Sequence, residues 1–206
     1  MKAIFYPSVP FVSLALPFIY KEIYLDQIYR FLQGTHDLTI LDIGANIGEV
    51  TRFIRPVAKK IYAIEPSPLE FEALKQNKEY NGWDNVEVFN LAIADKTGEM
   101  GFEITDGNRT GNHLSEKGKI RVPTKRLDEF MAVNKIDKVD FMKLDVEGAE
   151  REILKSDGFL SVRDKITSIL IEFHQPWVSE MLAYMVGLGY KMHHMKTDAD
   201  VYVFNR

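Results

Sequence analysis

The sequence predicts a doubly wound α/β fold, a Rossmann-like and mostly parallel sheet with helices on both faces. The main observation is that short apolar, β-branched runs alternate with helical patterns from residue 38 onward, as in chains built from βαβ units. The length, 206 residues, fits one hydrophobic core. Hydrophobic residues make up 46% and charged residues 27%, a composition typical of a globular chain.

The first half of this alternation contains three predicted strands and two helices. Each strand is a short apolar run, and Ser67-Pro68 signals the start of the second helix. Pro56 is expected to weaken the last turn of the first helix. The predicted strands span residues 38–43, 61–64 and 86–93, and the helices span 49–58 and 69–80.

The second half begins with a change of pattern. Strand-like runs at 99–105 and 119–123 flank a polar loop, 106–118, which predicts a β hairpin or excursion over the sheet. The alternation then resumes. Helices are predicted at 127–133, 149–156 and 176–188, and strands at 139–144, 166–173, 190–194 and 201–204.

Residues 1–36 are predicted to form an N-terminal arm, with a helix at 18–32, before the main domain at 37–206. The apolar stretch 3–20 is interrupted by three prolines, so we expect neither an export signal nor a membrane span. The absence of cysteine excludes disulfides and thiolate metal sites and suits a cytoplasmic enzyme. The net charge of -4 favours a small or neutral substrate over nucleic acid.

A glycine turn follows the first predicted strand, in the segment Asp42-Ile43-Gly44-Ala45-Asn46-Ile47-Gly48. A strand that ends in such a turn and leads into a helix lets a polar ligand approach the backbone closely. The dinucleotide pattern G-x-G-x-x-G is not satisfied, and G-x-x-x-x-G-K-[ST] does not occur. The turn therefore indicates a nucleotide-like ligand and disfavours NAD and ATP.

Glu65 ends the second predicted strand, about 20 residues after Gly44, where a carboxylate can accept both hydroxyls of a ribose. An adenosine ligand without a pyrophosphate explains the missing third glycine and favours S-adenosylmethionine. Three alternatives stay open: the glycines only make a turn while Glu65 caps a helix, the protein is a nicotinamide-dependent oxidoreductase, or it is a non-catalytic binding module.

The ends of two later strands carry titratable side chains that should meet in the ligand crevice. Asp145 could hold the ammonium group of the cofactor, Glu172 could orient a substrate hydroxyl, and His174 could take its proton as general base. Alternatively, Asp145, Glu172 and His174 could bind a divalent cation. Glu147 could instead be a carboxylate favoured by a helix N-terminus, and His174 could be a buried or capping histidine.

These motifs resemble the FkbM family of methyltransferases. The resemblance covers residues 38–175, through Leu41–Gly48, Ala63-Ile64-Glu65-Pro66, Asn81-Gly82, Asn85-Val86, Lys143–Glu150 and Glu172-Phe173-His174. It implies a seven-stranded class I sheet with an antiparallel last strand and O-methylation, often of a sugar or polyketide hydroxyl.

The resemblance also implies roles for single residues. The turn that starts at Asp42 would hold the methionine end of the cofactor through Gly44, Asn46 and Gly48. Glu65 would bind the ribose, and Asp145 would lie beside the transferred methyl group. We expect the adenine to contact Ala92 and Ile93. The acceptor would be a glycan or a small molecule, selected by the arm, by residues 106–118 and by the part after residue 175.

Overall fold

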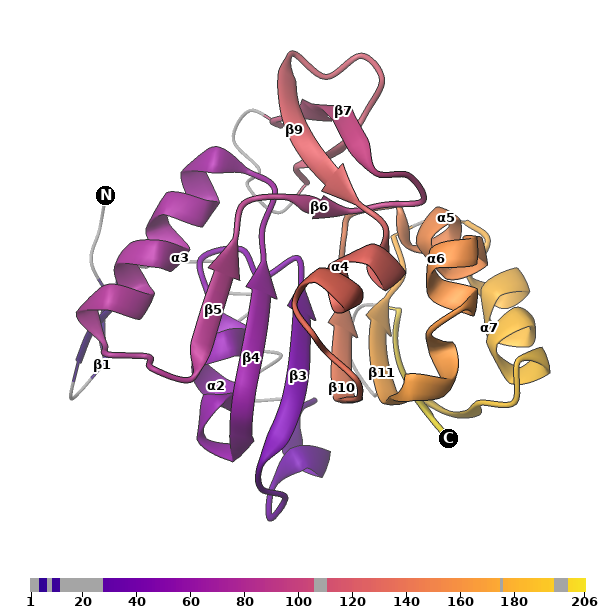
Figure 1. Ribbon diagram of the computed structural model, residues 1–206, viewed down its shortest axis with the longest axis horizontal. Coiled ribbons are helices and arrows are strands. Elements are labelled where there is room, and N and C mark those ends of the chain that lie inside the picture. Colours follow the sequence, from indigo (N-terminus) through magenta and orange to yellow (C-terminus); the bar gives the residue numbers. More distant parts are fainter. Residues whose placement is uncertain (1–3, 7–8, 12–27, 106–110, 175, 195–199) are drawn as a thin grey trace.

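A seven-stranded sheet forms the centre of the computed structural model, which describes residues 4–6, 9–11, 28–105, 111–174, 176–194 and 200–206. Six strands run in the same direction, and the last strand in the sequence is antiparallel to both of its neighbours, as expected (Figure 1). In spatial order the strands are β12 (Lys191–His194), β13 (Val201–Asn205), β11 (Ile166–Glu172), β10 (Val139–Leu144), β3 (Leu38–Ile43), β4 (Ala58–Ile64) and β5 (Val86–Phe89).

Helices cover both faces of this sheet because neighbouring strand residues point to opposite sides. Ile40 and Phe141 pack into one core with helices α2 (Glu49–Ile54) and α3 (Pro68–Tyr80). Leu41 and Met142 pack into the other core with four helices. These are α4 (Leu127–Val133), α5 (Glu150–Lys155), α6 (Asp157–Leu160) and α7 (Val178–Gly187). The predicted doubly wound fold is confirmed.

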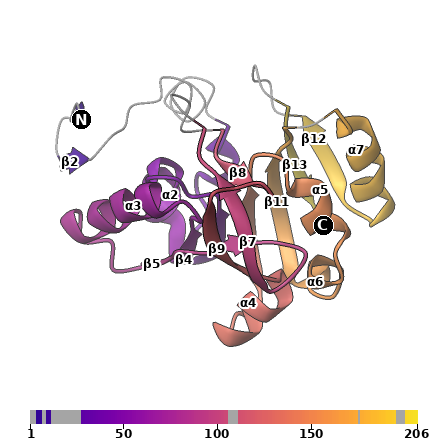
Figure 2. The ribbon, with the colours of Figure 1, turned by 90° about the horizontal axis from the view of Figure 1, so that it is seen from above.

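A second, four-stranded sheet contains the predicted excursion. Its strands are β6 (Ala92–Ile93), β9 (Ile120–Lys125), β7 (Gly98–Glu103) and β8 (His113–Leu114), and β7 pairs with β9 as an antiparallel hairpin. Figures 1 and 2 show this sheet beyond the carboxyl ends of the main strands. It therefore lies on the side of the molecule where an α/β sheet binds its ligands.

The predicted strand at 86–93 is wrong in its second half. It divides into β5 of the main sheet and β6 of the second sheet, separated by Asn90 and Leu91. The Asn90 side chain donates hydrogen bonds to the carbonyl oxygens of Glu65 (2.9 Å) and Pro66 (3.0 Å). These bonds hold the chain at the point where it leaves the main sheet, so an apolar run that looks continuous serves two sheets.

Two predicted helices differ from the structure, and one helix was missed. The helix expected at 49–58 ends at Ile54 and continues as a 3-10 turn, Arg55–Val57, because Pro56 has no N–H to donate. The helix α6 was not predicted; the Ser156 hydroxyl caps its first turn by accepting from the Phe159 N–H. The helix expected at 18–32 lies largely outside the described residues. Within its described part, Arg30–Leu32 form a 3-10 turn.

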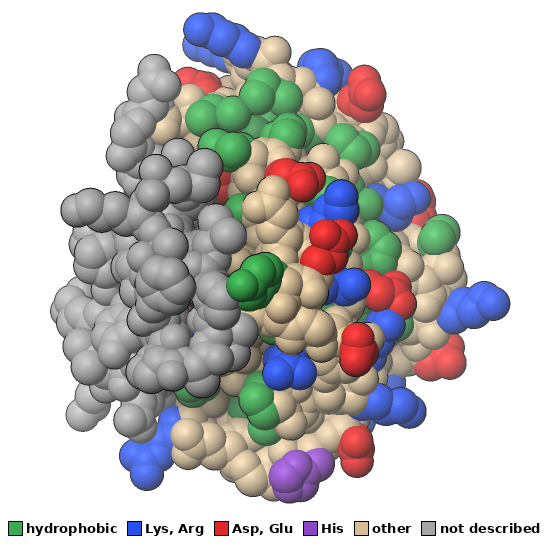
Figure 3. All heavy atoms as spheres, turned by 90° about the vertical axis from the view of Figure 1, so that its left-hand side faces the viewer, with side chains coloured by type: hydrophobic (Ala, Val, Ile, Leu, Met, Phe, Trp, Pro, Cys, Tyr) green, Lys and Arg blue, Asp and Glu red, His purple; other side chains and the backbone are tan. Residues whose placement is uncertain are grey.

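The described part of the N-terminal segment also contains a short antiparallel pair, β1 (Ile4–Tyr6) and β2 (Val9–Phe11), which the sequence analysis did not predict. Among the residues that the structure describes, the helices are all too short or too polar to cross a bilayer. The side of the molecule that carries α3 shows basic and acidic side chains interspersed (Figure 3).

Candidate active site

The turn after β3 is fixed by the two strands beside it. Gly44 has a φ of 82°, and its N–H and that of Ala45 both donate to the Ile64 carbonyl, each at 3.0 Å. On the other side, a Cβ at Gly44 would lie 1.7 Å from the carbonyl oxygen of Asp145. Glycine is therefore required at position 44 by conformation and by space, and the turn directly contacts the end of β10.

Gly48 and Asn46 complete the turn in left-handed conformations, with φ values of 91° and 51°. A Cβ at Gly48 would lie 2.6 Å from Leu74 Cδ1 of α3 and 3.1 Å from the Trp83 ring. The preference for glycine at position 48 thus comes from its left-handed conformation and from the closeness of Leu74 and Trp83, and the packing part was not predicted from the sequence. Contact of Gly48 with a cofactor stays a prediction.

Glu65 lies at the end of β4 and reaches back to the glycine turn. Its Oε2 accepts from the Asn46 N–H and its Oε1 from the Ser67 N–H, both at 2.8 Å. The carboxylate is almost completely buried. Burial raises the pKa of Glu65 to about 7, although the two N–H groups act in the opposite direction. Glu65 therefore connects the turn to the start of α3, and each oxygen keeps one lone-pair direction for a further donor.

A buried lysine joins β3 and β10 beneath the turn. Lys143 and Asp42 are partners in the register of the two parallel strands, so their side chains lie on the same face. Lys143 Nζ lies 2.8 Å from the Gly44 carbonyl oxygen, 2.9 Å from Asp145 Oδ2 and 3.8 Å from Asp42 Oδ1. These charges raise the pKa of Lys143 above its ordinary value, although burial opposes this.

Asp42 is fully buried, and the Thr51 hydroxyl donates to its Oδ2 at 2.5 Å. Burial raises its pKa despite the nearby Lys143. The Asp42 carboxylate therefore lies in the protein interior, where it contacts Thr51 and Lys143 and stabilises the start of the turn. No role was predicted for Lys143; a lysine at the inner face of an otherwise apolar strand was the signal that could have identified it.

Ala92 and Ile93, expected to contact adenine, pair with β9 in the second sheet, and both side chains are buried. Ile93 belongs to the core on the α4 side of the main sheet. Both side chains therefore pack in the interior, and the contact of these residues with adenine stays a prediction.

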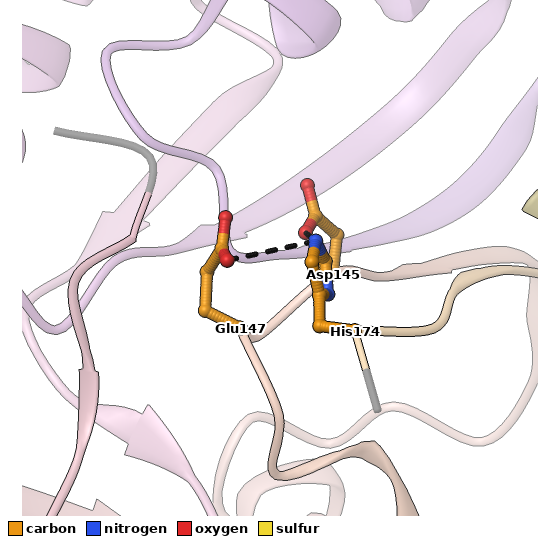
Figure 4. A group of neighbouring side chains, drawn as sticks. All are labelled: Asp145, Glu147 and His174. Atoms are coloured by element: carbon orange, nitrogen blue, oxygen red, sulfur yellow. Dashed lines mark ion pairs between the residues drawn. The ribbon is translucent and has the colours of Figure 1, made fainter. Parts of the chain in front are cut away.

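The ends of β10 and β11 place four carboxylates around one imidazole, as shown in part in Figure 4. His174 Nε2 lies 3.8 Å from Asp145 Oδ1, 3.5 Å from Glu147 Oε2 and 3.5 Å from Glu172 Oε1. His174 Nδ1 lies 3.1 Å from Oε1 of Glu150, whose side chain is 1% exposed. The structure thus brings together Asp145, Glu172 and His174, and with them Glu147, the second carboxylate expected at the end of this strand; it adds Glu150.

Glu147 does not lie at a helix N-terminus, so that interpretation is wrong. It has a φ of 56° in the loop before α5, and its carboxylate points toward His174. The helix begins instead at Glu150, whose Oε1 accepts from the N–H groups of Val146 (3.3 Å) and Gly148 (3.1 Å). The closest group of ligand atoms consists of Asp145, Glu147 and His174, rather than the trio with Glu172 that the sequence suggested.

Residues 42–192 match the family model of the methyltransferase FkbM domain, which is more than half of the chain. The chain belongs to the FkbM methyltransferase family. The resemblance found in the sequence motifs is therefore confirmed, and so is membership of a family of methyltransferases that use S-adenosylmethionine.

Two relatives of this FkbM-family chain have names that describe an activity. This chain is 31% identical over 140 residues to the 2-O-methyltransferase NoeI of Sinorhizobium fredii, and the match covers 57% of this chain and 56% of that protein. It is 27% identical over 143 residues to the hexuronic acid methyltransferase AglP of Haloferax volcanii, covering 69% and 58%. The chain therefore spans little more than half the length of either protein.

A crystal structure of methyltransferase FkbM from Methylobacillus flagellatus resembles the fold, with a TM-score of 0.58 at 16% identity. The match covers 82% of this chain and 44% of that one. It supports the fold assignment of the FkbM-family chain.

The charges around His174 determine which proton-transfer roles are open to it. Burial alone would lower the pKa of His174, but its contacts with Glu150 and Glu172 and the charges of Asp145 and Glu147 raise it to about 11. Burial and the neighbouring carboxylates raise the pKa of Glu147 to about 7, against the effect of His174. The surrounding carboxylates therefore favour the protonated form of His174, which has no free lone pair with which to act as a base.

Proposed function

We propose that this chain transfers a methyl group from S-adenosylmethionine to a hydroxyl oxygen of a sugar, glycan or small-molecule natural product. The observation that carries the proposal is the direct contact between Gly44 of the glycine turn and Asp145 of the acidic cluster. This contact sets a cofactor-type turn beside a group of proton acceptors at the carboxyl edge of the sheet. The name of the 2-O-methyltransferase NoeI supports O-methylation, and the name of the hexuronic acid methyltransferase AglP supports a sugar acceptor.

On the cofactor side, we assign the methionine end to the backbone of the Gly44–Gly48 turn and the ribose hydroxyls to Glu65. The two oxygens of Glu65 already accept backbone N–H groups, and each keeps a lone pair that could accept one hydroxyl donor. Asp145, held by Lys143, lies next to the turn and is assigned to the methyl-bearing end. Asp42 supports the turn from within.

On the acceptor side, bound S-adenosylmethionine would supply a methyl group to the acceptor hydroxyl oxygen, with a C–O bond formed as the C–S bond breaks and S-adenosylhomocysteine as the leaving group. A carboxylate of the cluster would take the hydroxyl proton. Asp145, Glu172 and His174 are assigned to this step, with Glu147 in addition. His174 acts as a cation that organises the carboxylates, rather than as the base expected from the sequence, because its pKa is about 11.

Cofactor binding is tested by titrating S-adenosylhomocysteine into the protein in a calorimeter. We expect Glu65→Ala to weaken binding about 10- to 150-fold, since a charge-assisted hydrogen bond contributes about 1.5–3 kcal/mol. Glu87→Ala is the control, because Glu87 makes a surface ion pair with Lys60. Thermal unfolding must show that Glu65→Ala is folded. Unchanged affinity in a folded Glu65→Ala variant would remove Glu65 from the site.

Methyl transfer is tested with labelled S-adenosylmethionine and a panel of sugars and small molecules that carry free hydroxyls. Glu172→Gln should lower the transfer rate about 100-fold or more and leave S-adenosylhomocysteine affinity unchanged. Glu152→Gln, on the exposed side of α5, is the matched control. Cofactor binding without transfer to any acceptor would favour the alternative of a non-catalytic module, and NADH binding without S-adenosylmethionine binding would favour an oxidoreductase. The cytoplasmic location and the absence of a nucleic-acid partner stay predictions.

A further inference from the structure

We propose that Asp145, Glu147 and His174 bind a divalent cation that holds the acceptor hydroxyl in place. The binding of the cation stands on the structure of the cluster alone. Its role in holding the hydroxyl rests on the proposed function.

The three ligand atoms are close enough to share one ion. They all lie within 4.8 Å of one another, and they come from the end of β10, the loop before α5 and the end of β11 (Figure 4). Ligand atoms on opposite sides of an ion with bonds of about 2.1 Å lie about 4 Å apart, so small side-chain rotations complete the site. The three side chains are 22–26% exposed, which leaves access for an ion and for an exogenous ligand.

A buried carboxylate orients the imidazole as metal sites require. Glu150 Oε1 lies 3.1 Å from His174 Nδ1, and the Glu150 side chain is 1% exposed. Glu150 is itself held by the N–H groups of Val146 and Gly148. With a proton fixed on Nδ1, the ring presents Nε2 to Asp145 and Glu147, and a cation bound there would displace the second ring proton that His174 carries without it. Histidines that bind metals are commonly oriented in this way by a carboxylate on the other ring nitrogen.

One oxygen of Asp145 is directed into the same space without a hydrogen-bond partner among the described residues, and its ion-pair contact with His174 is long. Oδ2 is held by Lys143 at 2.9 Å, which fixes the orientation of the carboxylate. Oδ1 is buried and lies 3.8 Å from His174 Nε2, and within the described residues it has no hydrogen-bond partner. A buried carboxylate oxygen without a partner is costly. A cation between Asp145 and Glu147 removes that cost and reduces the repulsion among the carboxylates.

The donor set favours manganese or magnesium. Two carboxylates provide the hard oxygen ligands that Mg²⁺ and Mn²⁺ prefer, and a single imidazole nitrogen shifts the preference toward Mn²⁺. Three protein ligands leave coordination positions for water or for a substrate hydroxyl, whose acidity the ion increases. Glu172 is outside the trio, and its nearest cluster contact is His174 at 3.5 Å. Glu172 is thereby left as the carboxylate that takes the hydroxyl proton.

The test is a titration of EDTA-treated full-length chain with Mn²⁺, followed by electron paramagnetic resonance of the free ion, without cofactor or acceptor. We expect one Mn²⁺ per chain, and an affinity at least about 10-fold weaker in Glu147→Gln. Glu150→Gln, which removes the charge that orients His174, should weaken binding about 10- to 100-fold. Glu152→Gln should bind as the unaltered chain does. Circular dichroism and thermal unfolding establish that each variant is folded.

Absence of Mn²⁺ binding by the unaltered chain, or equal binding by folded Glu147→Gln, would overturn the proposal. Failure of the cation site can be distinguished from failure of the proposed methyl transfer. Mn²⁺ binding that depends on Glu147 in a protein without methyl transfer keeps the cation site and rejects the transfer reaction. Methyl transfer that persists in EDTA, by a protein that binds no Mn²⁺, rejects the cation site and keeps the reaction.

Discussion

The glycine turn after β3 and the acidic cluster after β10 and β11 meet at one edge of the sheet, but their polar atoms are satisfied differently. At the turn, both Glu65 oxygens accept backbone N–H groups at 2.8 Å. In the cluster, His174 Nε2 faces three carboxylates at 3.5–3.8 Å. The turn is thus shaped by backbone geometry, whereas the cluster is an arrangement of charges. Substitutions at the turn should therefore mainly lower the stability of the fold. Substitutions at the cluster should mainly change the pKa values of its side chains or the binding of ligands.

The largest effect is expected for Gly44→Ala. Its Cβ would lie 1.7 Å from the Asp145 carbonyl oxygen, so the ends of β3 and β10 must separate. We expect a loss of more than about 4 kcal/mol in the free energy of unfolding, measured with urea. Gly34→Ala is a matched control, because Gly34 has the same φ of 82° and open space around it. It should lose only the about 1–2 kcal/mol of left-handed strain. Equal losses would show that contact with Asp145 is unimportant.

Next in size is Lys143→Met, which changes the connection between the two regions. Its ammonium group lies among Asp42, Asp145 and the Gly44 carbonyl, and removing it leaves buried negative charge without a partner. We expect a loss of about 3–5 kcal/mol in the free energy of unfolding. Lys138→Met, which breaks the exposed pair with Asp140, should cost within about 1 kcal/mol. A loss no larger than that of the control would mean that Asp42 and Asp145 are accommodated without Lys143.

The sequence predicted the layers of the fold because each strand alternates between two buried faces and each helix is signalled locally. β3, α4 and β10 occur at the predicted residues. Local patterns could not show that the run 86–93 divides between two sheets, since that depends on hydrogen bonds from Asn90 to residues near 65. The short helix α6 was missed because it occupies a single turn.

Within the site, the sequence located Asp145, Glu172 and His174 because the carboxyl ends of parallel strands meet at one edge. It could not assign Lys143, whose role depends on strand register, or Glu150, whose contact with His174 joins residues far apart in the chain. The sequence also could not show that Ala92 and Ile93, which follow the strand whose end was expected to contact adenine, have buried side chains.

The last comparison concerns the change of stability with pH in the protein without ligands. The folded-state pKa values of Glu65 and Glu147 are raised to about 7 and that of Asp42 is also raised, so the folded chain binds protons more tightly than the unfolded chain. Stability should therefore fall as pH rises from about 4.5 to 7. The contribution of His174, with a raised pKa of about 11, is fully present below its unfolded value near 6.5 and is lost as pH rises toward 11.

Thermal unfolding at constant ionic strength should accordingly give a lower Tm at pH 8 than at pH 5. Each 1 kcal/mol corresponds to roughly 2–4 °C for a protein of this size. Glu147→Gln removes one titrating group and should flatten the decline between pH 4.5 and 7, whereas Glu152→Gln should keep it. If the decline comes from the turn rather than the cluster, Glu147→Gln will retain the full slope and Glu65→Gln will lose it. A Tm that rises over this range would contradict the charge arrangement in both regions.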